Sequence, residues 1–501
     1  MLNLRAVHGP VRASSATLAK ELDLTDPIDS TRGHVEDFAA QFARWSAGLQ
    51  AETLPPEVLA AVQTNLLDTL GCAIAGHGAQ GVGALASLAS DWGGKPEATI
   101  WCTHHRVPAH QAAWVNGMMA HARDYDDTHD RAVLHAGVTV VPAAIAAAEL
   151  NPLATGADLA AGIAAGLELV CRLGLAADMG PIEAGFIYTA LLGNFAATAA
   201  AARVARLDAT TTANALGITL SQADGTHQVT RDAALTKRMQ PGFAARTGLV
   251  SVALAQAGIT GAIHTFEGVD GLFNTYLRGR FDPQRLRAQL GERFELLDLS
   301  YKPYPCCRHT HTAIDAALRL RQRLAEPALD EAVVTVELNA QAYQAVCTPP
   351  DVRRAPATMV EAQFSIPFTV ACALLQGHVE LADFDADRLR DPAIRALTAK
   401  VQCKVGDDLE RDWSRHVTPA RITLETRGTV ATETVLRPRG HPEEPMTRQD
   451  FIQKLASCLA ASELVWPQGT AESLRQRVDG LLHLSSGMEV IQPLCSFQPA
   501  P

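Results

Sequence analysis

Apolar residues follow a helical spacing through the first half of the chain. Between about residues 34 and 288 they recur at three- and four-residue intervals, as in LPPEVLAAVQTNLLDTLGCAIAG, which opens on prolines and closes on glycine. Other segments, such as GADLAAGIAAGLELVCRLG and YTALLGNFAATAAAARVA, are apolar nearly all round, which is typical of helices buried in a bundle. We therefore predict a large all-α domain over residues 34–288.

A different pattern begins near residue 289. Short β-branched or alternating segments follow between turn residues, as expected of strands: FELLDLSYKPYP, AVVTVELNAQAY, AKVQCKVGDDL, ARITLETRG and VATETVLRPRG. Helical segments lie between them, and helical periodicity returns at TRQDFIQKLASCLA and GTAESLRQRVDGLLHL. The prediction is a mainly α fold in which a smaller α+β domain, 289–445, is followed by C-terminal helices, 446–495, that return to the helical domain. Residues 1–33 show no clear periodic element and are expected to be a flexible N-terminal segment.

Composition narrows the class of protein. The 501 residues are 47% hydrophobic and carry a formal net charge of −11, which argues against a nucleic-acid partner, since phosphate binding needs a basic face. No uninterrupted apolar run of about 18 residues occurs, so no membrane span is predicted. Ten cysteines without C-x-x-C pairs indicate reduced thiols in the cytoplasm rather than a disulfide framework.

The stretch HARDYDDTHDRAVLHAG, residues 121–137, gathers four aspartates and three histidines within an otherwise apolar region. It could be a metal-diphosphate site, a proton-transfer site or a solvated loop. DDTHD matches the D-D-x-x-D that holds Mg²⁺ in helical prenyl-diphosphate enzymes, and carboxylate oxygens suit that ion. We find no second acidic motif, and aromatic residues make up only 5% of the chain, so that interpretation is the weaker one.

Three further stretches have both a chemical and an ordinary interpretation. GHGAQG matches G-x-G-x-x-G but lacks the strand and helix of a nucleotide site, so a glycine-rich turn is favoured. Cys306 and Cys307, with His309 and His311, could bind zinc, could be buried thiols, or could transfer protons from the start of a helix. LTKRMQPGFAARTG places Lys237 and Arg238 before Pro-Gly; with a helix N-terminus at Gly242, this would be a carboxylate pocket, and otherwise a solvated pair of cations.

Taken together, these stretches resemble the MmgE/PrpD family. VNGMMAHARDYDDTH is similar to its N-G-x-x-x-H-x-x-D-[YF]-D-D-T signature, TKRMQPGFAARTG to its lysine motif, KPYPCCRHTH to its hinge motif, and EAQFSIPFTVACALLQG to a later helix. The matches follow the family's order from about residue 35 to 480. The resemblance implies a helical domain with a smaller α+β lid domain, usually in a homodimer, acting on a small polycarboxylate.

The resemblance also implies the site residues. In the family the acidic stretch is a wall of the active-site cleft, into which Asp124 and Thr128 would point, and His135 matches a cleft histidine. Lys237 matches the catalytic lysine and Lys302 a second cleft lysine.

Four more positions follow from the resemblance. Tyr343 matches a tyrosine of the lid domain. Ile187 and Cys307 stand where the decarboxylase-like pattern has histidines, so that histidine set is incomplete here. Tyr188, next to Ile187, could supply a phenol or could be a packing aromatic.

Known members include 2-methylcitrate dehydratase, cis-aconitate decarboxylase and iminodisuccinate epimerase, and their shared step moves a proton at a carbon beside a carboxylate. Cations must stabilise the developing enediolate, for which Lys237, Lys302 and a helix N-terminus at Gly242 are the candidates. His135 is the natural base, with Lys237 the other candidate.

The reaction class depends on the fate of the intermediate that proton removal creates. With Tyr188 or Cys307 as the acid for a leaving hydroxyl, the enzyme would be a dehydratase of the 2-methylcitrate type, which is the favoured prediction. Reprotonation on the opposite face would make it an epimerase of the iminodisuccinate type, and a cis-aconitate-type decarboxylase is the third alternative. No metal, flavin or nucleotide is required by this chemistry, so no cofactor is predicted.

Overall fold

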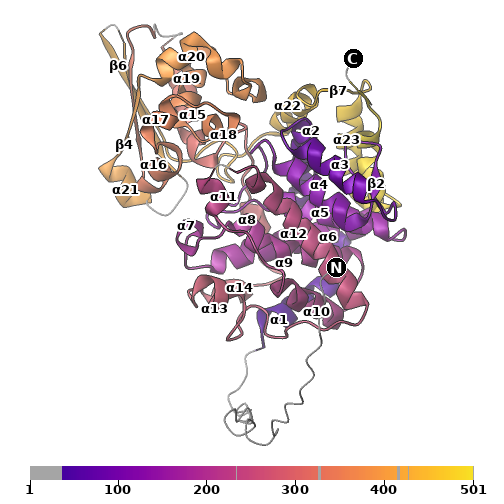
Figure 1. Ribbon diagram of the computed structural model, residues 1–501. Helices are drawn as coiled ribbons and strands as arrows, with labels where there is room; N and C mark the ends of the chain where they lie inside the picture. The colour runs from indigo at the N-terminus through magenta and orange to yellow at the C-terminus, as the bar shows by residue number, and fades with distance from the viewer. Residues whose placement is uncertain (1–35, 233, 325–328, 414–417, 427, 500–501) are drawn as a thin grey trace, which may run out of the picture. The chain divides into compact units, whose positions relative to one another are not determined.

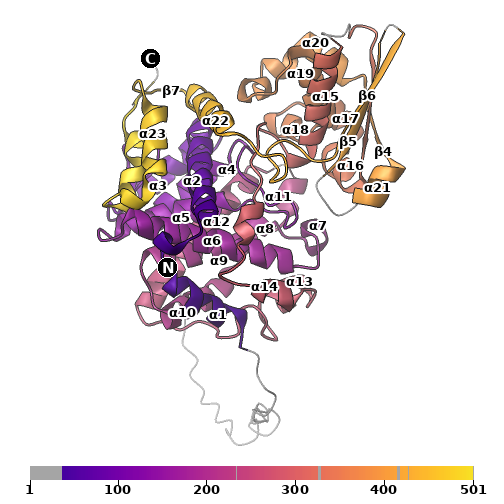
Figure 2. The same cartoon turned by 180° about the vertical axis from the view of Figure 1, so that it is seen from behind.

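The computed structural model describes residues 36–232, 234–324, 329–413, 418–426 and 428–499. The fold is mainly α, and the predicted N-terminal segment 1–33 lies outside the described residues. Figures 1 and 2 show the chain from opposite sides. Two apolar cores organise the described part: one runs from Phe38 to Leu299 and again from Leu455 to Leu494, and the other lies between Tyr304 and Val435. The limits 34–288, 289–445 and 446–495 stay predictions.

Helices build the first core. Their bounds are α1 (Phe38–Gly48), α2 (Pro56–Gly76), α3 (Val82–Trp92), α4 (Ala109–His121), α5 (Gly137–Leu150), α6 (Gly156–Ala176), α7 (Pro181–Ala184), α8 (Tyr188–Leu191), α9 (Gly193–Val204), α10 (Ala209–Leu220), α11 (Gln228–Arg231), α12 (Thr236–Gln256), α13 (Leu272–Leu277), α14 (Pro283–Arg287), α22 (Arg448–Ala460) and α23 (Thr470–Asp479). Short strand pairs accompany them: β1 (Ala98–Thr99) with β2 (Arg106–Val107), and β7 (Leu464–Val465) with β8 (Gln498–Pro499).

Close helix crossings explain the many small residues in this region. A Cβ built on Gly242 of α12 would lie 2.1 Å from the carbonyl oxygen of Trp114 in α4, and one on Gly117 would lie 2.8 Å from the Cα of Gly242. Glycine therefore lets α4 and α12 touch backbone to backbone.

Helices α2 and α6 have the length and hydropathy of membrane spans, but 67% and 100% of their apolar windows are buried inside the fold, as in core helices.

The second core combines helices with a four-stranded sheet. Its elements are α15 (His311–Arg323), β3 (Val333–Leu338), α16 (Ala340–Val346), α17 (Pro350–Arg354), α18 (Met359–Gln363), α19 (Ile366–Gln376), α20 (Pro392–Thr398), β4 (Val401–Val405), α21 (Asp407–Trp413), β5 (Ala420–Thr426) and β6 (Thr429–Val435). The strand order is β4-β3-β5-β6, with β3 and β4 parallel and the other pairs antiparallel. Alternate residues of β3 and β5 are buried, and α15 and α19 lie on one side of the sheet in both views (Figures 1 and 2).

One predicted strand is wrong. The segment FELLDLS forms the 3-10 helix η2 (Glu295–Asp298) and packs in the first core. The backbone N–H of Leu296 donates to the buried carboxylate of Glu168 on α6, 3.2 Å away. A tertiary partner, rather than a neighbouring strand, therefore satisfies this backbone. The other 3-10 helices are η1 (Ala51–Thr53), η3 (Arg308–Thr310), η4 (Leu381–Phe384), η5 (Arg388–Arg390), η6 (Leu481–His483) and η7 (Gly487–Cys495).

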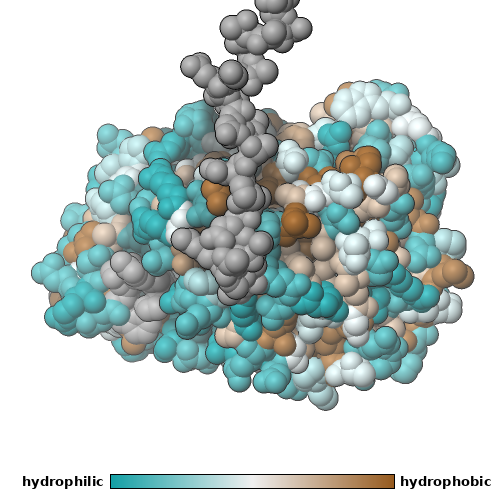
Figure 3. Space-filling model, turned by 90° about the horizontal axis from the view of Figure 1, so that it is seen from below, coloured by the Kyte–Doolittle hydropathy of each residue, from teal (hydrophilic) through white to brown (hydrophobic). Residues whose placement is uncertain are grey.

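The C-terminal helix α22 is tied to the helical core by a buried charge. Lys454 places its Nζ 2.6 Å from the carboxylate of Asp68 on α2 and donates to the carbonyl of Tyr125 at 2.7 Å. Elsewhere, exposed large apolar side chains such as Leu153, Ile263 and Val269 occur, and the face in Figure 3 mixes hydrophilic and hydrophobic residues. Scattered apolar exposure of this kind is ordinary for a folded chain.

Candidate active site

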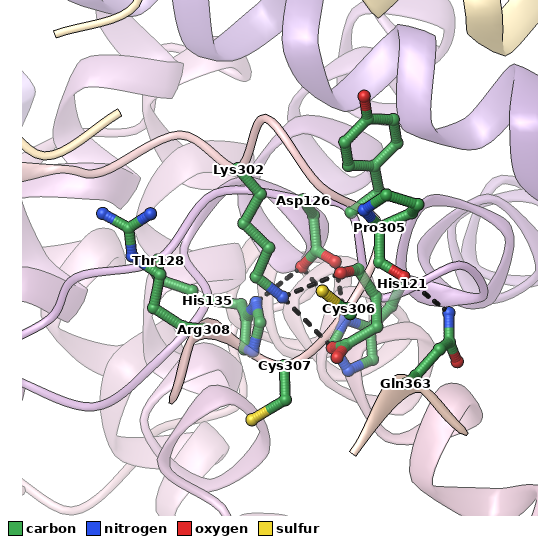
Figure 4. A network of polar contacts seen from close by, with 12 residues as sticks. His121, Asp126, Thr128, His135, Lys302, Pro305, Cys306, Cys307, Arg308 and Gln363 are labelled. Atoms are coloured by element: carbon green, nitrogen blue, oxygen red, sulfur yellow. Dashed lines mark hydrogen bonds and ion pairs between the residues drawn. The ribbon is translucent and has the colours of Figure 1, made fainter. Parts of the chain in front are cut away.

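The loop between α4 and α5 brings the acidic stretch back toward the end of α4. Asp124 has a φ of 52°, a left-handed conformation that aspartate tolerates better than most residues, and its N–H donates to the carbonyl of His121 at 3.2 Å. The chain therefore turns sharply after α4. The turn brings His121 and Asp126 close to His135, which precedes α5, and the three side chains point toward one another (Figure 4).

Asp126 holds two imidazoles. Its carboxylate lies 3.0 Å from Nδ1 of His121 and 2.8 Å from Nδ1 of His135, and the two rings meet edge to face with centroids 4.7 Å apart. His121 and Asp126 are buried, whereas the His135 side chain is 19% exposed. Within the described part of the chain, Nε2 of His135 has no protein partner. That nitrogen is therefore free to exchange a proton with a ligand.

Two lysines stand beside this trio. Nζ of Lys237, in the first turn of α12, lies 3.3 Å from Nε2 of His121 and 3.6 Å from the Asp124 carboxylate. Lys302 is almost completely buried; its Nζ donates to the carbonyl of Asp124 at 2.8 Å and lies 3.2 Å from that carboxylate. Lys237 keeps 18% of its side chain exposed. Lys237 is therefore the ammonium that a ligand could reach, and Lys302 anchors Asp124.

The electrostatics fix the protonation states. Burial lowers the pKa of His121 to about 4, more than Asp126 raises it, so the ring is neutral at pH 7. A carboxylate only accepts hydrogen bonds, so Nδ1 of His121 carries the hydrogen and Nε2 accepts one from Lys237. Burial opposes the charge on Asp124, but Lys302 and Lys237 outweigh it and lower the pKa of this carboxyl. For Lys302, burial opposes the charge, but Asp124 and Asp126 outweigh it and raise the pKa.

His121, Asp126 and His135 are also the group of potential metal ligands found among the described residues, with ligand atoms within 4.8 Å of one another. A divalent cation there would face the ammonium of Lys237 on the outer nitrogen of His121. That positive charge opposes a second cation at so short a distance. The donor set therefore fits proton sharing better than metal binding.

The D-D-x-x-D hypothesis is wrong for this stretch, because its acids face three different partners. Asp126 holds the histidines. Asp127 accepts from the backbone N–H groups of Ala136 and Gly137 at 3.0 and 2.9 Å, at the start of α5. Asp130 accepts from Arg308 and Ser300. The carboxylates do not converge on a common metal position.

The predicted helix N-terminus at Gly242 is also wrong. Helix α12 begins at Thr236 and continues through Pro241 and Gly242. Gly242 is buried against α4, where its missing side chain allows the close crossing. Lys237, and not Gly242, therefore lies in the first turn of the helix.

The hinge stretch does not assemble a zinc site either, because its side chains diverge. Sγ of Cys306 lies 3.0 Å from the hydroxyl of Thr310, Nδ1 of His309 contacts Thr418, and Nε2 of His311 lies 3.2 Å from a backbone carbonyl. Burial raises the pKa of Cys307 to about 11, so this thiol stays protonated at neutral pH. Its sulfur points away from Lys302 (Figure 4).

The remaining predicted site residues have partners of their own. Thr128 donates its hydroxyl to Asp130 at 3.0 Å and pairs its backbone with Ser300. Tyr188 is buried, and its hydroxyl donates to the carbonyl of Met179. Tyr343 lies in α16, partly buried against the second core. Their roles toward a substrate stay predictions, as do those of His135, Lys237, Asp124, Lys302 and Cys307.

The sequence analysis did not predict His121 and Asp126 as site residues. Together with His135 they form what we call the histidine–aspartate cluster. Both stand in the quoted signature VNGMMAHARDYDDTH, and the histidine at the end of a helix pattern, five residues before an aspartate, was the available sign. Their pairing depends on the turn at Asp124, which no periodicity shows.

Family models and curated proteins match the sequence of this chain over most of its length. A family model described as the MmgE/PrpD N-terminal domain matches residues 40–284, and one described as the MmgE/PrpD C-terminal domain matches residues 304–472. A cis-aconitate decarboxylase-like protein of Aspergillus oryzae is 27% identical over 448 residues, 85% of this chain and 91% of that protein. The cis-aconitate decarboxylase of Mus musculus is 27% identical over 452 residues, 88% of this chain and 90% of that protein. A 2-methylcitrate dehydratase of Cupriavidus necator is 27% identical over 166 residues, 30% of this chain and 34% of that protein.

The two domain models together span most of the chain, and the range of the N-terminal one contains the histidine–aspartate cluster and Lys237. On these matches, the chain belongs to the MmgE/PrpD family.

Proposed function

We propose that this protein is a cofactor-independent lyase that decarboxylates an unsaturated tricarboxylate of the cis-aconitate class. The observation that carries the proposal is the pair formed by the free Nε2 of His135 and the accessible ammonium of Lys237, both fixed by the cluster around Asp126. The relatives named as cis-aconitate decarboxylases match over 85% or more of this chain, whereas the dehydratase relative matches over 30%. This support favours decarboxylation over the dehydration that the sequence first suggested.

The chemistry needs one proton-transfer group. The bond between a carbon and its carboxylate breaks, CO₂ leaves, and the electron pair shifts through the neighbouring double bond. The far alkene carbon then takes a proton from Nε2 of His135, whose imidazolium form is paired with Asp126 at 2.8 Å. Lys237 would neutralise charge on a carboxylate that remains. One imidazole is sufficient for this step, which is compatible with Ile187 and Cys307 at the two positions that depart from the decarboxylase-like histidine pattern.

Dehydration of a 2-methylcitrate-type acid is the second candidate, supported by the shorter dehydratase match. It requires an acid for the leaving hydroxyl in addition to a base. The hydroxyl of Tyr188 is engaged with the carbonyl of Met179, and the thiol of Cys307 has its pKa raised by burial to about 11. Neither group is well suited to that task, which is why we rank dehydration second.

A homodimer and a cytoplasmic location remain part of the proposal.

The test is proton NMR in D₂O with the purified, EDTA-treated protein. We expect cis-aconitate to lose CO₂ and gain one deuterium at carbon per turnover, with no effect of the chelator on rate. A new alkene from 2-methylcitrate without CO₂ would favour the dehydratase instead. Deuterium exchange with a changed diastereomer ratio would favour an epimerase, and no change in any of these acids would refute the lyase proposal.

Lys237→Ala and His135→Ala should each lower turnover at least about a hundredfold, because each removes a group that acts in the transition state. His105→Ala, which removes an exposed histidine, is the matched control and should retain turnover. Near-normal turnover of Lys237→Ala would contradict the assigned role.

A further inference from the structure

Two buried arginines lie next to the cluster, and neither forms an ion pair with a carboxylate in the described part of the chain. Arg123 directly follows the end of α4 and Arg238 lies in the first turn of α12; they are 9% and 6% exposed. Nη1 of Arg123 lies 3.6 Å, and Nη2 of Arg238 3.8 Å, from the same atom, Sδ of Met359 in α18. The two guanidinium groups therefore face each other across one thioether.

Their positive charges are not compensated by close contacts. Among the described residues, no carboxylate lies within 4.0 Å of either guanidinium, and Arg123 donates its Nε to the carbonyl of Ala75 at 2.9 Å. Burial lowers the pKa of both arginines, and for Arg238 the nearby Arg123 lowers it further. Acids beyond ion-pairing distance, Asp385 and Glu463 for Arg123 and Asp124 for Arg238, only partly oppose this lowering. A thioether is a weak acceptor, and arginine does not lose its proton in proteins. Two like charges buried in this way are costly unless an anion joins them.

The charge balance of the cluster indicates which anion. Lys237 and Lys302 are balanced by Asp124 and Asp126, and both histidines share Asp126, so the cluster offers little surplus positive charge to a ligand. A tricarboxylate brings three negative charges. The unpaired guanidiniums are the additional cations that such a ligand needs.

Helix α18 connects the two arginines with Lys237. Met359, at its start, contacts both arginines, and Phe364, just after its end, lies under Nζ of Lys237 with 5.3 Å to the ring centroid. Five residues of helix rise by about 7.5 Å, comparable to the length of a small tricarboxylic acid. Gln363 of the same helix donates to the carbonyl of Arg123 at 2.7 Å, which fixes this segment against the arginines.

We infer that Arg123 and Arg238 form a carboxylate subsite, covered by Met359, that holds the carboxylate of the substrate remote from Lys237. The inference rests on the proposed function for the identity of the ligand. Arginine suits the task because its planar fork binds a carboxylate through two parallel hydrogen bonds. The subsite would select tricarboxylates over dicarboxylates.

Calorimetric titration tests this without turnover. The probes are propane-1,2,3-tricarboxylate, which has no double bond, and glutarate, which lacks the third carboxylate. Arg238→Gln and Arg123→Gln should each weaken tricarboxylate binding about 10- to 100-fold, the usual effect of losing a hydrogen bond to a charged group, and change glutarate binding little. Equal losses for both probes, or no loss, would overturn the inference.

Three controls separate the remaining outcomes. Arg246→Gln removes a cation from the same helix α12, where Arg246 stacks over Trp114, and should leave both affinities unchanged. In the absence of ligand, Arg238→Gln should melt no lower than the parent, because it removes an unpaired buried charge; a marked drop would mean that the arginine already has a structural partner. Arg238→Lys keeps the charge without the fork and should lie between the parent and Arg238→Gln.

Inorganic phosphate distinguishes a substrate subsite from a site for a free anion. Phosphate that competes with the tricarboxylate, and loses this competition in Arg238→Gln, supports the inference. Phosphate that binds at the arginines without competing would assign them to a separate anion and overturn it. The proposed function fails separately: selective tricarboxylate binding by a protein inactive on every acid would keep the subsite and refute the lyase, whereas turnover without selectivity would do the reverse.

Discussion

At the scale of single residues, the cluster works by fixing which nitrogen carries which proton. Asp126 accepts from Nδ1 of His121 and forms an ion-pair contact of 2.8 Å with Nδ1 of His135, which leaves Nε2 of His121 to accept from Lys237 and Nε2 of His135 to face a ligand. A neutral His121 thus positions the lysine without adding charge. The same carboxylate therefore orients both the proton-transfer group and the cation beside it.

Asp126→Asn should lower turnover about a hundredfold or more. The neutral amide cannot balance the positive charge of the imidazolium that delivers the proton, as the carboxylate does. The fold should persist, since the amide has the same shape. The measurement is turnover together with its pH profile, and Asp298→Asn, at an acid whose side chain is 42% exposed, is the control. A variant with the parent's pH profile and rate would show that the bridging carboxylate does not act in the reaction.

At the scale of elements, the site depends on how closely α4 and α12 approach. Helix α4 ends at His121, and α12 carries Lys237 in its first turn. Their crossing at Gly117 and Gly242 sets the 3.3 Å contact between the two side chains. Two glycines that contribute no side chain to the site therefore determine its geometry.

Gly242→Ala should destabilise the fold by about 1–3 kcal/mol, because its Cβ would meet the Trp114 carbonyl at 2.1 Å and a backbone atom cannot move aside cheaply. It should also reduce turnover by displacing Lys237. Gly83→Ala in α3 is the matched control: nothing lies within 4 Å of its Cβ, and it should stabilise by about 0.4–1 kcal/mol. Urea unfolding measures both, and equal stability of the two variants would contradict the argument.

The elements also show how far sequence reasoning reaches. The bounds of α2 follow from its proline and glycine, β3 to β5 fall within predicted strand segments, and β6 begins one residue before the segment predicted for it. The segment FELLDLS was assigned wrongly because its backbone is satisfied by Glu168 on a distant helix. Proline usually interrupts helices, so the sequence predicts a helix start at Gly242. In the structure α12 instead continues through Pro241 and packs against α4.

At the scale of the whole molecule, the site joins segments that are far apart in the chain. The sequence motifs predicted Asp124, His135, Lys237 and Lys302 as site residues, and the structure brings these four together around His121 and Asp126. The unpaired arginines could not be predicted, because whether a charged side chain lacks a partner is a property of the complete fold. Burial of ionisable groups on this scale also makes stability depend on pH.

Acidification should destabilise the protein between pH 6.5 and 4. Burial lowers the pKa of His129 to about 4 and that of His311 well below its ordinary value, so both stay neutral when folded but bind protons once unfolded. Since the unfolded chain then binds more protons, the free energy of unfolding falls as pH falls through this window. Asp127 acts in the opposite sense, because burial and Asp126 raise its pKa to about 6 and its protonation favours the folded state as pH falls. Burial also lowers the pKa of His121 and of His309 to about 4, so the buried histidines together outweigh this carboxyl, which predicts a net loss of several kcal/mol by pH 4.5.

The urea concentration at the unfolding midpoint, followed from pH 7 to 4.5, measures this loss. His129→Asn should flatten the slope, since the amide oxygen can still accept the hydrogen bond that Nδ1 of His129 receives from Ala132 but no group remains to titrate. His105→Asn, at an exposed position, should leave the slope unchanged. A midpoint that stays constant or rises toward pH 4.5 would mean that Asp127 outweighs the buried histidines, and this buried carboxyl next to the start of α5 would then govern the acid response.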